Sequence, residues 1–318
     1  MKLKSAVLFL SLFGLNIFAF AQGEHCTIVR QGVIYISPDK SSPKVADVER
    51  GRDLVALDST PTWIHVEAVL AGRQRNDEDQ PEPRIVTGWV LGKGVVRAST
   101  PNGDRIVFGE AVDSEDQASR ARGRAGAAQD AKRLYYRLYD LFPKSPLAAE
   151  SLYRAADIQW QLDRADIMTR PSAREQQAFL RGKMNESLMK EVMKKFPDTK
   201  WADLAAFHLI ENKLCGDWQG ASKCPEKEAG YYEDYVKDHP QSPAAAEALY
   251  DAAWRWSALI QIYVTEDQKK KSEDAKSRAI SLAQRVASSY PQSDWGSRAQ
   301  TLLYLVQQDV PTWGNAQE

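Results

Sequence analysis

The chain has 318 residues, of which 43% are hydrophobic and 27% are charged, and this is the composition of an ordinary folded protein. Its 42 Lys and Arg residues nearly balance its 43 Asp and Glu residues, so the formal net charge is −1. This balance argues against nucleic acid or an anionic membrane as a partner recognised through overall charge. The three cysteines and four histidines lack metal-ligand spacing, so we expect no metal and no cofactor.

Residues 1–21 have the three-part layout of a secretory signal peptide. Two early lysines supply positive charge, residues 6–20 are mostly apolar, and Ala19-Phe20-Ala21 is a small-x-small cleavage motif. The alternative is a transmembrane anchor, which needs roughly 20 apolar residues and therefore a longer run than this one. Cys26 does not follow a lipid-attachment motif. We expect cleavage after Ala21 and a soluble mature chain in the periplasm or outside the cell.

Residues 25–98 have the pattern of short β-strands separated by turns. Runs of β-branched, aliphatic and aromatic residues are bounded by Gly, Pro, Asp or Ser, and they cover residues 27–29, 33–36, 45–48, 54–57, 63–66 and 88–91. Five or so short strands at this spacing favour a small barrel that closes its own edges. The charged, Pro-containing insert Ala71–Arg84 is expected to be a loop between two strands.

This region resembles the bacterial SH3-like domain family. The resemblance rests on Val33–Pro38, Glu49-Arg50-Gly51, Trp63–Val66 and Gly88-Trp89-Val90, of which the last is the most specific. It implies ligand or cell-wall binding, because relatives often accompany peptidoglycan enzymes. Two roles stay open for Tyr35, Trp63 and Trp89. They could stack on a peptide or glycan, or they could pack in the barrel core, because strand aromatics are commonly buried anchors.

Residues 99–126 are interpreted as a linker between two domains. The segment begins with the turn cluster Ser99–Asp104 and ends in several arginines. Arg105–Phe108 is a candidate additional strand. The basic end either binds an anionic group or is simply solvated.

Residues 127–309 contain an internal repeat. Residues 145–156 and 242–253 are identical at nine of twelve positions, and a turn of aromatic or His, Pro, any residue and then Ser or Thr occurs four times. Proline ends the preceding helix, and the Ser or Thr after it is suited to cap the next one. The sequence therefore predicts about four helix pairs, followed by a tail at residues 310–318.

The repeats resemble the tetratricopeptide family, particularly its envelope branch. The matching motifs are Phe142-Pro143-Lys144-Ser145, Ala149–Leu152 and Tyr153–Ala156. The spacing exceeds the family's 34 residues, which puts superhelical regularity in doubt. Stacked helix pairs of this kind bind extended or helical peptides. The predicted contact residues are Tyr135, Tyr139, Tyr232 and Tyr235. The alternative is that these tyrosines pack between helices.

Cys215 and Cys224 flank a loop-like octapeptide. In an oxidising compartment they are candidates for a disulfide, and free thiols are the alternative. A Cys/His hydrolase would need Cys215 beside His208, with a third group to orient the base. No other catalytic motif is present. The leading interpretation is a non-catalytic exported adaptor that binds a protein or peptide partner, and a peptidoglycan-binding accessory protein is the alternative.

Overall fold

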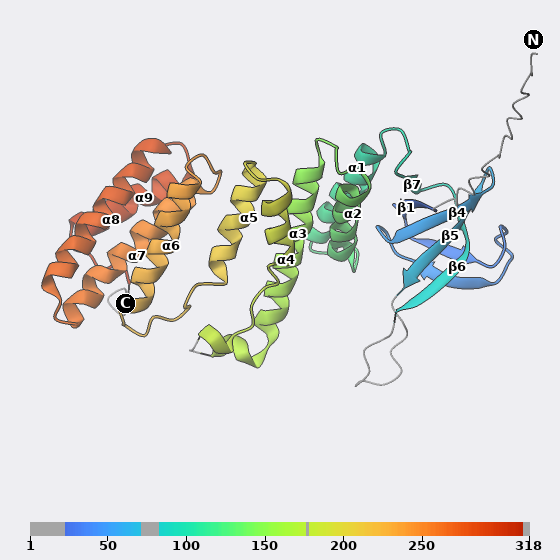
Figure 1. Cartoon of the computed structure of the whole chain (residues 1–318). Coiled ribbons are helices and arrows are strands. Elements are labelled where there is room, and N and C mark those ends of the chain that lie inside the picture. The colour runs from blue at the N-terminus through green and yellow to red at the C-terminus, as the bar shows by residue number, and fades with distance from the viewer. Residues whose placement is uncertain (1–22, 71–82, 176–177, 314–318) are drawn as a thin grey trace, which may run out of the picture.

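The structure is a computed structural model that describes residues 23–70, 83–175 and 178–313. The predicted signal peptide and most of the Ala71–Arg84 insert lie outside these residues. Within the described ranges, no helix has the length and apolar character needed to cross a membrane. A sheet lies at one end of the molecule, and the helices follow it in chain order toward the C-terminus (Figure 1).

The N-terminal region is one antiparallel sheet of seven strands in the order β3-β2-β6-β5-β4-β1-β7. The strands are β1 (Glu24–Ile28), β2 (Gly32–Tyr35), β3 (Lys44–Val48), β4 (Asp53–Ser59), β5 (Trp63–Leu70), β6 (Arg84–Leu91) and β7 (Val95–Arg97). The expected closed barrel is not formed, because β3 and β7 are the two ends of the order and do not pair with each other.

The open edge at β7 has a physical reason in the helices that follow it. Only three residues long, β7 is followed within a few residues by a helix, and its Val96 packs into the same core as Val107 and Ala111 of that helix. A packed helix therefore lies where a closing strand would be needed. On the sheet itself, side chains alternate between two faces, and one face forms a core around Ile34, Val66 and Val90.

The described residues contain nine α-helices and two short 3-10 segments. The helices are α1 (Gly103–Ser119), α2 (Ala127–Leu141), α3 (Ala148–Thr169), α4 (Ser187–Lys195), α5 (Lys200–Glu211), α6 (Lys223–Asp238), α7 (Ala245–Thr265), α8 (Lys269–Ser289) and α9 (Asp294–Gln307), with η1 (Pro171–Arg174) and η2 (Ala178–Leu180) between α3 and α4. The segment 99–126, expected to be a linker with a strand at 105–108, instead contains α1.

The four predicted helix pairs are α2/α3, α4/α5, α6/α7 and α8/α9. Thr199 and Ser293 cap α5 and α9 as expected, each accepting a hydrogen bond from a backbone amide of the first turn. Ser145 and Ser242 instead accept from the amide two residues ahead, in a turn that precedes α3 and α7. These two helices therefore begin two residues later than the cap pattern predicts.

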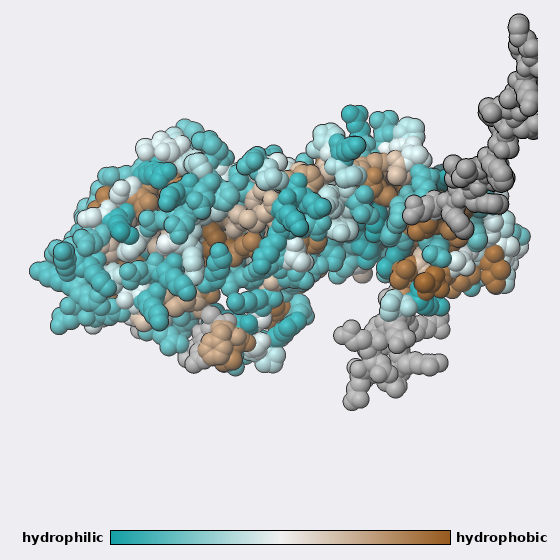
Figure 2. Space-filling model, in the orientation of Figure 1, coloured by the Kyte–Doolittle hydropathy of each residue, from teal (hydrophilic) through white to brown (hydrophobic). Residues whose placement is uncertain are grey.

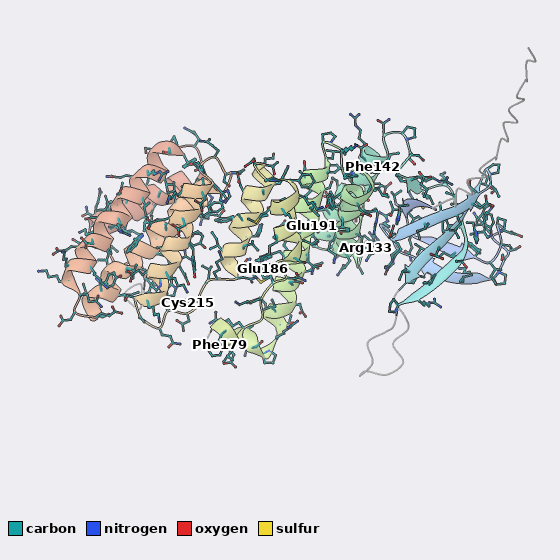
Figure 3. All side chains as sticks on the ribbon, in the orientation of Figure 1. Arg133, Phe142, Phe179, Glu186, Glu191 and Cys215 are labelled. Carbon is teal, nitrogen blue, oxygen red and sulfur yellow. A yellow bond between two sulfur atoms is a disulfide. The ribbon has the colours of Figure 1, made fainter. Side chains whose placement is uncertain are left out.

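The sheet docks directly on the first helices. Val29 and Val96 share a core with Leu134 and Leu138 of α2. Arg133 of α2, which Figure 3 shows on the side of the helix array nearest the sheet, donates from Nε to the backbone oxygen of Arg50 at 2.9 Å. The sheet and the helices are therefore joined by apolar packing and by polar contacts.

Candidate functional site

The four tyrosines predicted to contact a partner pack mainly between helices. Tyr135, Tyr232 and Tyr235 are buried. Tyr139 is partly buried, and its hydroxyl donates to Glu191 at 3.1 Å. Tyrosine side chains in such positions anchor helices to one another. These four side chains therefore offer little surface to a partner.

The three aromatic residues singled out in the sheet lie on one face. Tyr35 pairs with Trp89 across the sheet, and Trp89 pairs with His65, so these side chains point the same way. Trp63 is two residues before His65 and shares that face. The Tyr35 and Trp63 rings meet edge-on at 5.6 Å, and Trp89 stacks on His65 at 4.9 Å. This face is opposite the sheet core.

Cys215 and Cys224 form a disulfide, with their Cα atoms 6.0 Å apart. The bond closes the loop between α5 and α6, where Figure 3 labels Cys215. The backbone amide of Cys215 donates to Glu228 at 2.7 Å, and Glu228 in turn pairs with the buried Arg255 at 2.9 Å. The sulfur required by the hydrolase alternative is therefore held in a disulfide.

The same aromatic pair occurs twice on the helix array. Tyr153 of α3 lies 5.3 Å from Trp201 of α5, and Tyr250 of α7 lies 5.3 Å from Trp295 of α9, measured between ring centroids. Each tyrosine is the sixth residue of its helix and each tryptophan the second. All four side chains are partly exposed. The repeated sequence thus places an equivalent aromatic pair in each half of the array.

In the first half, polar groups occupy the space beside the pair. His208 Nε2 lies 3.3 Å from an Asp157 carboxylate oxygen and 3.2 Å from the Tyr153 hydroxyl. Burial lowers the pKa of His208 and raises the pKa of Asp157, while their mutual attraction opposes both shifts. Because Asp157 and Tyr153 approach the same ring nitrogen, they do not form the relay in which a base activates a nucleophile and a third group orients the base.

In the second half, apolar groups replace them and leave a cavity. Asp157 follows Tyr153 by four residues, and the residue four positions after Tyr250 is Trp254. His208 follows Trp201 by seven residues, and the residue seven positions after Trp295 is Leu302. Trp254 and Leu302 line a cavity of about 230 Å³ with Tyr250, Arg298, Thr301, Leu305 and Thr312. Aromatic walls beside a single charged group suit the side chain of a bound peptide.

Arg298 supplies the charge at this cavity. Its side chain is exposed, and its guanidinium lies 4.9 Å from the ring centroid of Trp295. Within the described part of the chain, no carboxylate approaches it closely enough to form an ion pair. Burial, and then the charge of Asp251, raises the pKa of nearby Glu247, and the charge of Arg298 opposes this shift. Arg298 therefore places an exposed positive charge at the cavity, within the electrostatic range of Glu247.

The described residues were searched for a metal site, and the sequence for signals of the α7/α9 cavity. No group of three or more His, Cys, Asp or Glu side chains is arranged to hold a metal ion. The sequence pattern also contained a signal for the α7/α9 cavity that was missed. Tyr250 stands in the repeated dodecapeptide and Trp295 follows the last Pro-Gln-Ser turn, so aligning the repeats matches Tyr250 with Tyr153 and Trp295 with Trp201.

Comparison with known protein families found no family model that matches the chain, and comparison with curated proteins found no match. Among solved structures, a "DHF79 filament" is 14% identical over 63% of this chain and 96% of that chain, with a TM-score of 0.22. The de novo designed helical repeat protein DHR64 is 14% identical over 65% of this chain and 94% of that chain, with a TM-score of 0.20. TM-scores this low establish no relationship between these proteins and the chain.

Proposed function

We propose that the protein is an exported, non-catalytic adaptor that binds a peptide segment of a partner protein on the α7/α9 face. The export part rests on the N-terminal sequence, with its charged start, apolar run and small-x-small motif. The observation that carries the binding part is the cavity beside Tyr250 and Trp254, with the unpaired Arg298 at its rim. In this proposal the repeated helices are of the tetratricopeptide kind and the sheet region is of the SH3-like kind.

The chemistry of the cavity defines the segment that it would take. An apolar side chain of the partner enters between Tyr250, Trp254 and Leu302, and an acidic side chain nearby pairs with Arg298. Aromatic residues and arginine are the side chains that contribute most to protein interfaces. The first half of the array offers the same aromatic pair with His208 and Asp157 in place of the apolar wall, so it contributes contact area without this anchor.

The test is a binding measurement on purified residues 22–318. Short peptides are selected from a random library, and their affinities are measured by fluorescence polarisation. Trp254→Ala and Arg298→Glu are expected to weaken binding at least tenfold, which corresponds to about 1.4 kcal/mol. Lys270→Glu, an exposed charge reversal on α8, is the matched control and leaves affinity unchanged. If both cavity variants bind like the wild type, the proposed site is wrong.

A second candidate function, peptidoglycan binding, is favoured by one observation on the sheet. Tyr35, Trp63 and Trp89 lie on one face, and the rings of Tyr35 and Trp89 are partly exposed. Aromatic rings of this kind stack on sugars and peptides. Sedimentation of residues 22–318 with purified peptidoglycan tests the idea, with Trp89→Ala as the variant. Protein that stays in the supernatant excludes this candidate.

A further inference from the structure

The segment between α3 and α4 projects from the helix array. Since α3 has 22 residues and the preceding helix α2 has 15, the C-terminal end of α3 extends about two turns beyond the start of α2. The chain then passes through η1 and η2 before it reaches α4, and Figure 1 shows this segment at the lower edge of the row of helices. We call its described residues, 168–175 and 178–183, the α3 tip.

The α3 tip exposes large apolar side chains. Phe179 is 76% exposed, more than any other large hydrophobic side chain of the described residues, and Met168 is 68% exposed. Leu180, beside Phe179, is also exposed. Figure 3 labels Phe179 at the outer end of the segment, and Figure 2 shows hydrophobic surface at that edge of the molecule. Exposed apolar groups that polar residues surround mark contacts with a protein partner or a membrane.

Contacts at its base hold the α3 tip in place. Ile167 is buried, and an added Cβ at Gly182 would lie 2.9 Å from its side chain, so the returning chain passes closely over the end of α3. The Nε atom of Arg181 donates to the backbone oxygen of Glu175 at 2.6 Å. The apolar side chains are therefore presented by a folded segment, and covering them orders little additional chain.

Positive charge surrounds these apolar side chains. The described residues of the tip carry four cations and one anion, Glu175, in a chain whose formal net charge is −1. The cations are Arg170, Arg174, Arg181 and Lys183. Arg170 is paired with Asp166 of α3. The balance of charge over the whole chain therefore conceals a local surplus of positive charge at the tip.

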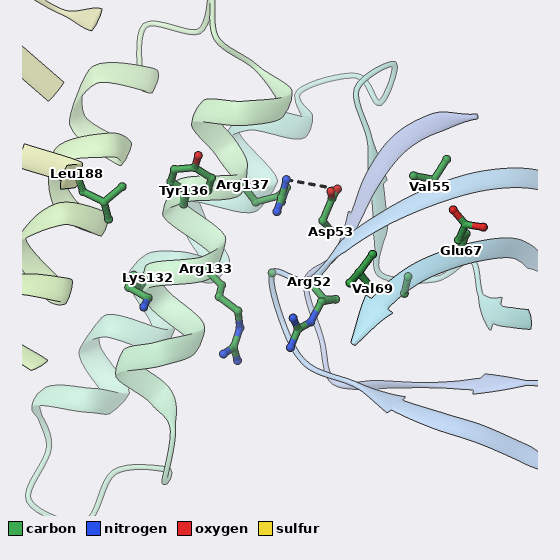
Figure 4. Close-up of a pocket in the computed structure, with 12 residues that line it drawn as sticks. Arg52, Asp53, Val55, Glu67, Val69, Lys132, Arg133, Tyr136, Arg137 and Leu188 are labelled. Atoms are coloured by element: carbon green, nitrogen blue, oxygen red, sulfur yellow. Dashed lines mark ion pairs between the residues drawn. The ribbon is translucent and has the colours of Figure 1, made fainter. Parts of the chain in front are cut away.

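Two of the four cations have no ion pair. Arg174 and Lys183 are exposed, and no carboxylate of the described residues pairs with either. Lys183 acts at longer range on Glu186, which is itself paired with Lys190 at 2.7 Å. The arginines at the contact between the sheet and α2 are instead paired within the protein, as the dashed ion pair in Figure 4 shows for one of them. The charge at the tip can thus act on an external anionic surface.

We propose that the α3 tip docks the protein on the surface of an anionic phospholipid bilayer. Phe179 and Leu180 enter the boundary between headgroups and acyl chains. Arg174 and Lys183 stay among the phosphates. Elements that combine apolar and cationic side chains bind such boundaries through buried apolar area and attraction to anionic lipid. A convex tip fits a bilayer, which closes around an inserted side chain, better than it fits a protein, which would need a matching hollow.

The experiment is sedimentation of purified residues 22–318 with lipid vesicles. One set of vesicles contains equal parts of phosphatidylcholine and phosphatidylglycerol, and the other contains phosphatidylcholine alone. We expect at least tenfold tighter binding to the first set, because each cation near the surface is attracted only by anionic lipid, and we expect this binding to weaken as salt is added. Protein that stays in the supernatant with both sets, or that binds both equally, overturns the proposal.

A pair of variants tests the apolar part of the contact. Phe179→Ser is expected to weaken binding to the anionic vesicles about tenfold, because it removes the side chain that leaves water. Ile85→Ser is the matched control, since Ile85 is 69% exposed but lies on the sheet, and it should bind like the wild type. Circular dichroism verifies the fold of both variants. Binding that Ile85→Ser weakens and Phe179→Ser does not would move the contact to the sheet and overturn the proposal.

A double charge reversal tests the cationic part. Arg174→Glu with Lys183→Glu should remove the preference for phosphatidylglycerol, and Lys144→Glu with Lys270→Glu, the same change of charge at exposed positions elsewhere, should preserve it. Equal loss in both double variants would show attraction to the overall charge alone and would contradict a contact at the tip. Trp254→Ala should leave vesicle binding unchanged, because the tip and the α7/α9 cavity are separate surfaces.

Discussion

Gly51 is the most direct probe of the contact between sheet and helices. Its φ is +72°, and an added Cβ would lie 2.7 Å from both the Cβ of Arg133 and the backbone nitrogen of Leu134. A side chain in left-handed conformation costs about 1–2 kcal/mol. Overpacking against a fixed neighbour costs about 1–3 kcal/mol more. We therefore expect Gly51→Ala to lower the free energy of unfolding by about 2–5 kcal/mol.

Gly126 provides the matched control. Its φ is +76°, and an added Cβ would have no heavy atom within 4 Å, so Gly126→Ala should incur only the conformational cost of about 1–2 kcal/mol. The assay is urea unfolding of residues 22–318, followed by far-UV circular dichroism and tryptophan fluorescence. The difference between the two variants isolates the clash with α2. Equal destabilisation by both would refute the direct docking of the sheet on α2.

Three further predictions concern the disulfide, the buried ion pair and the remaining cysteine. Reduction of the bond between Cys215 and Cys224, nine residues apart, should lower the free energy of unfolding by about 2.5 kcal/mol, measured by denaturation with and without reductant. Glu228→Gln should cost about 1–3 kcal/mol in the same assay, because it removes the closer carboxylate from the buried Arg255 and leaves only the longer pair with Asp251 at 3.6 Å. Burial raises the pKa of Cys26 to about 12, so native protein at pH 8 should release no thiol signal to a titrating disulfide reagent, and unfolded protein should release one.

The helical region was predictable because its signals are local. A proline after an aromatic residue ends a helix wherever the chain is placed, and Thr199 and Ser293 cap helices by reaching an amide three residues away. The burial of Tyr135 and Tyr235 was not predictable in this way. Which face of a helix meets a neighbour depends on the packing of several helices together, and the repeat pattern alone leaves that choice open.

Two predictions for the N-terminal half were wrong, the closed barrel and the linker at residues 99–126, and both depend on contacts between segments that are distant in the sequence. Closure of the barrel depends on how far β3 lies from β7, and sequence patterns define strands without defining that distance. The segment 99–126 was interpreted as a linker because it begins with a turn cluster and ends in several arginines. Val107 and Ala111 are enough to hold α1 against the core, since the sheet and α2 supply the remaining apolar surface.

The central claim is that a partner binds at the α7/α9 cavity, and site-specific photo-crosslinking in the host cell tests it most directly. A photo-reactive amino acid replaces Arg298 in one strain and Lys270 in a control strain, and adducts are identified by mass spectrometry. We predict one dominant protein adduct from position 298, lost when Trp254→Ala is added, and none from position 270. The same adducts from both positions, or an adduct that persists in the Trp254→Ala background, would contradict the claim.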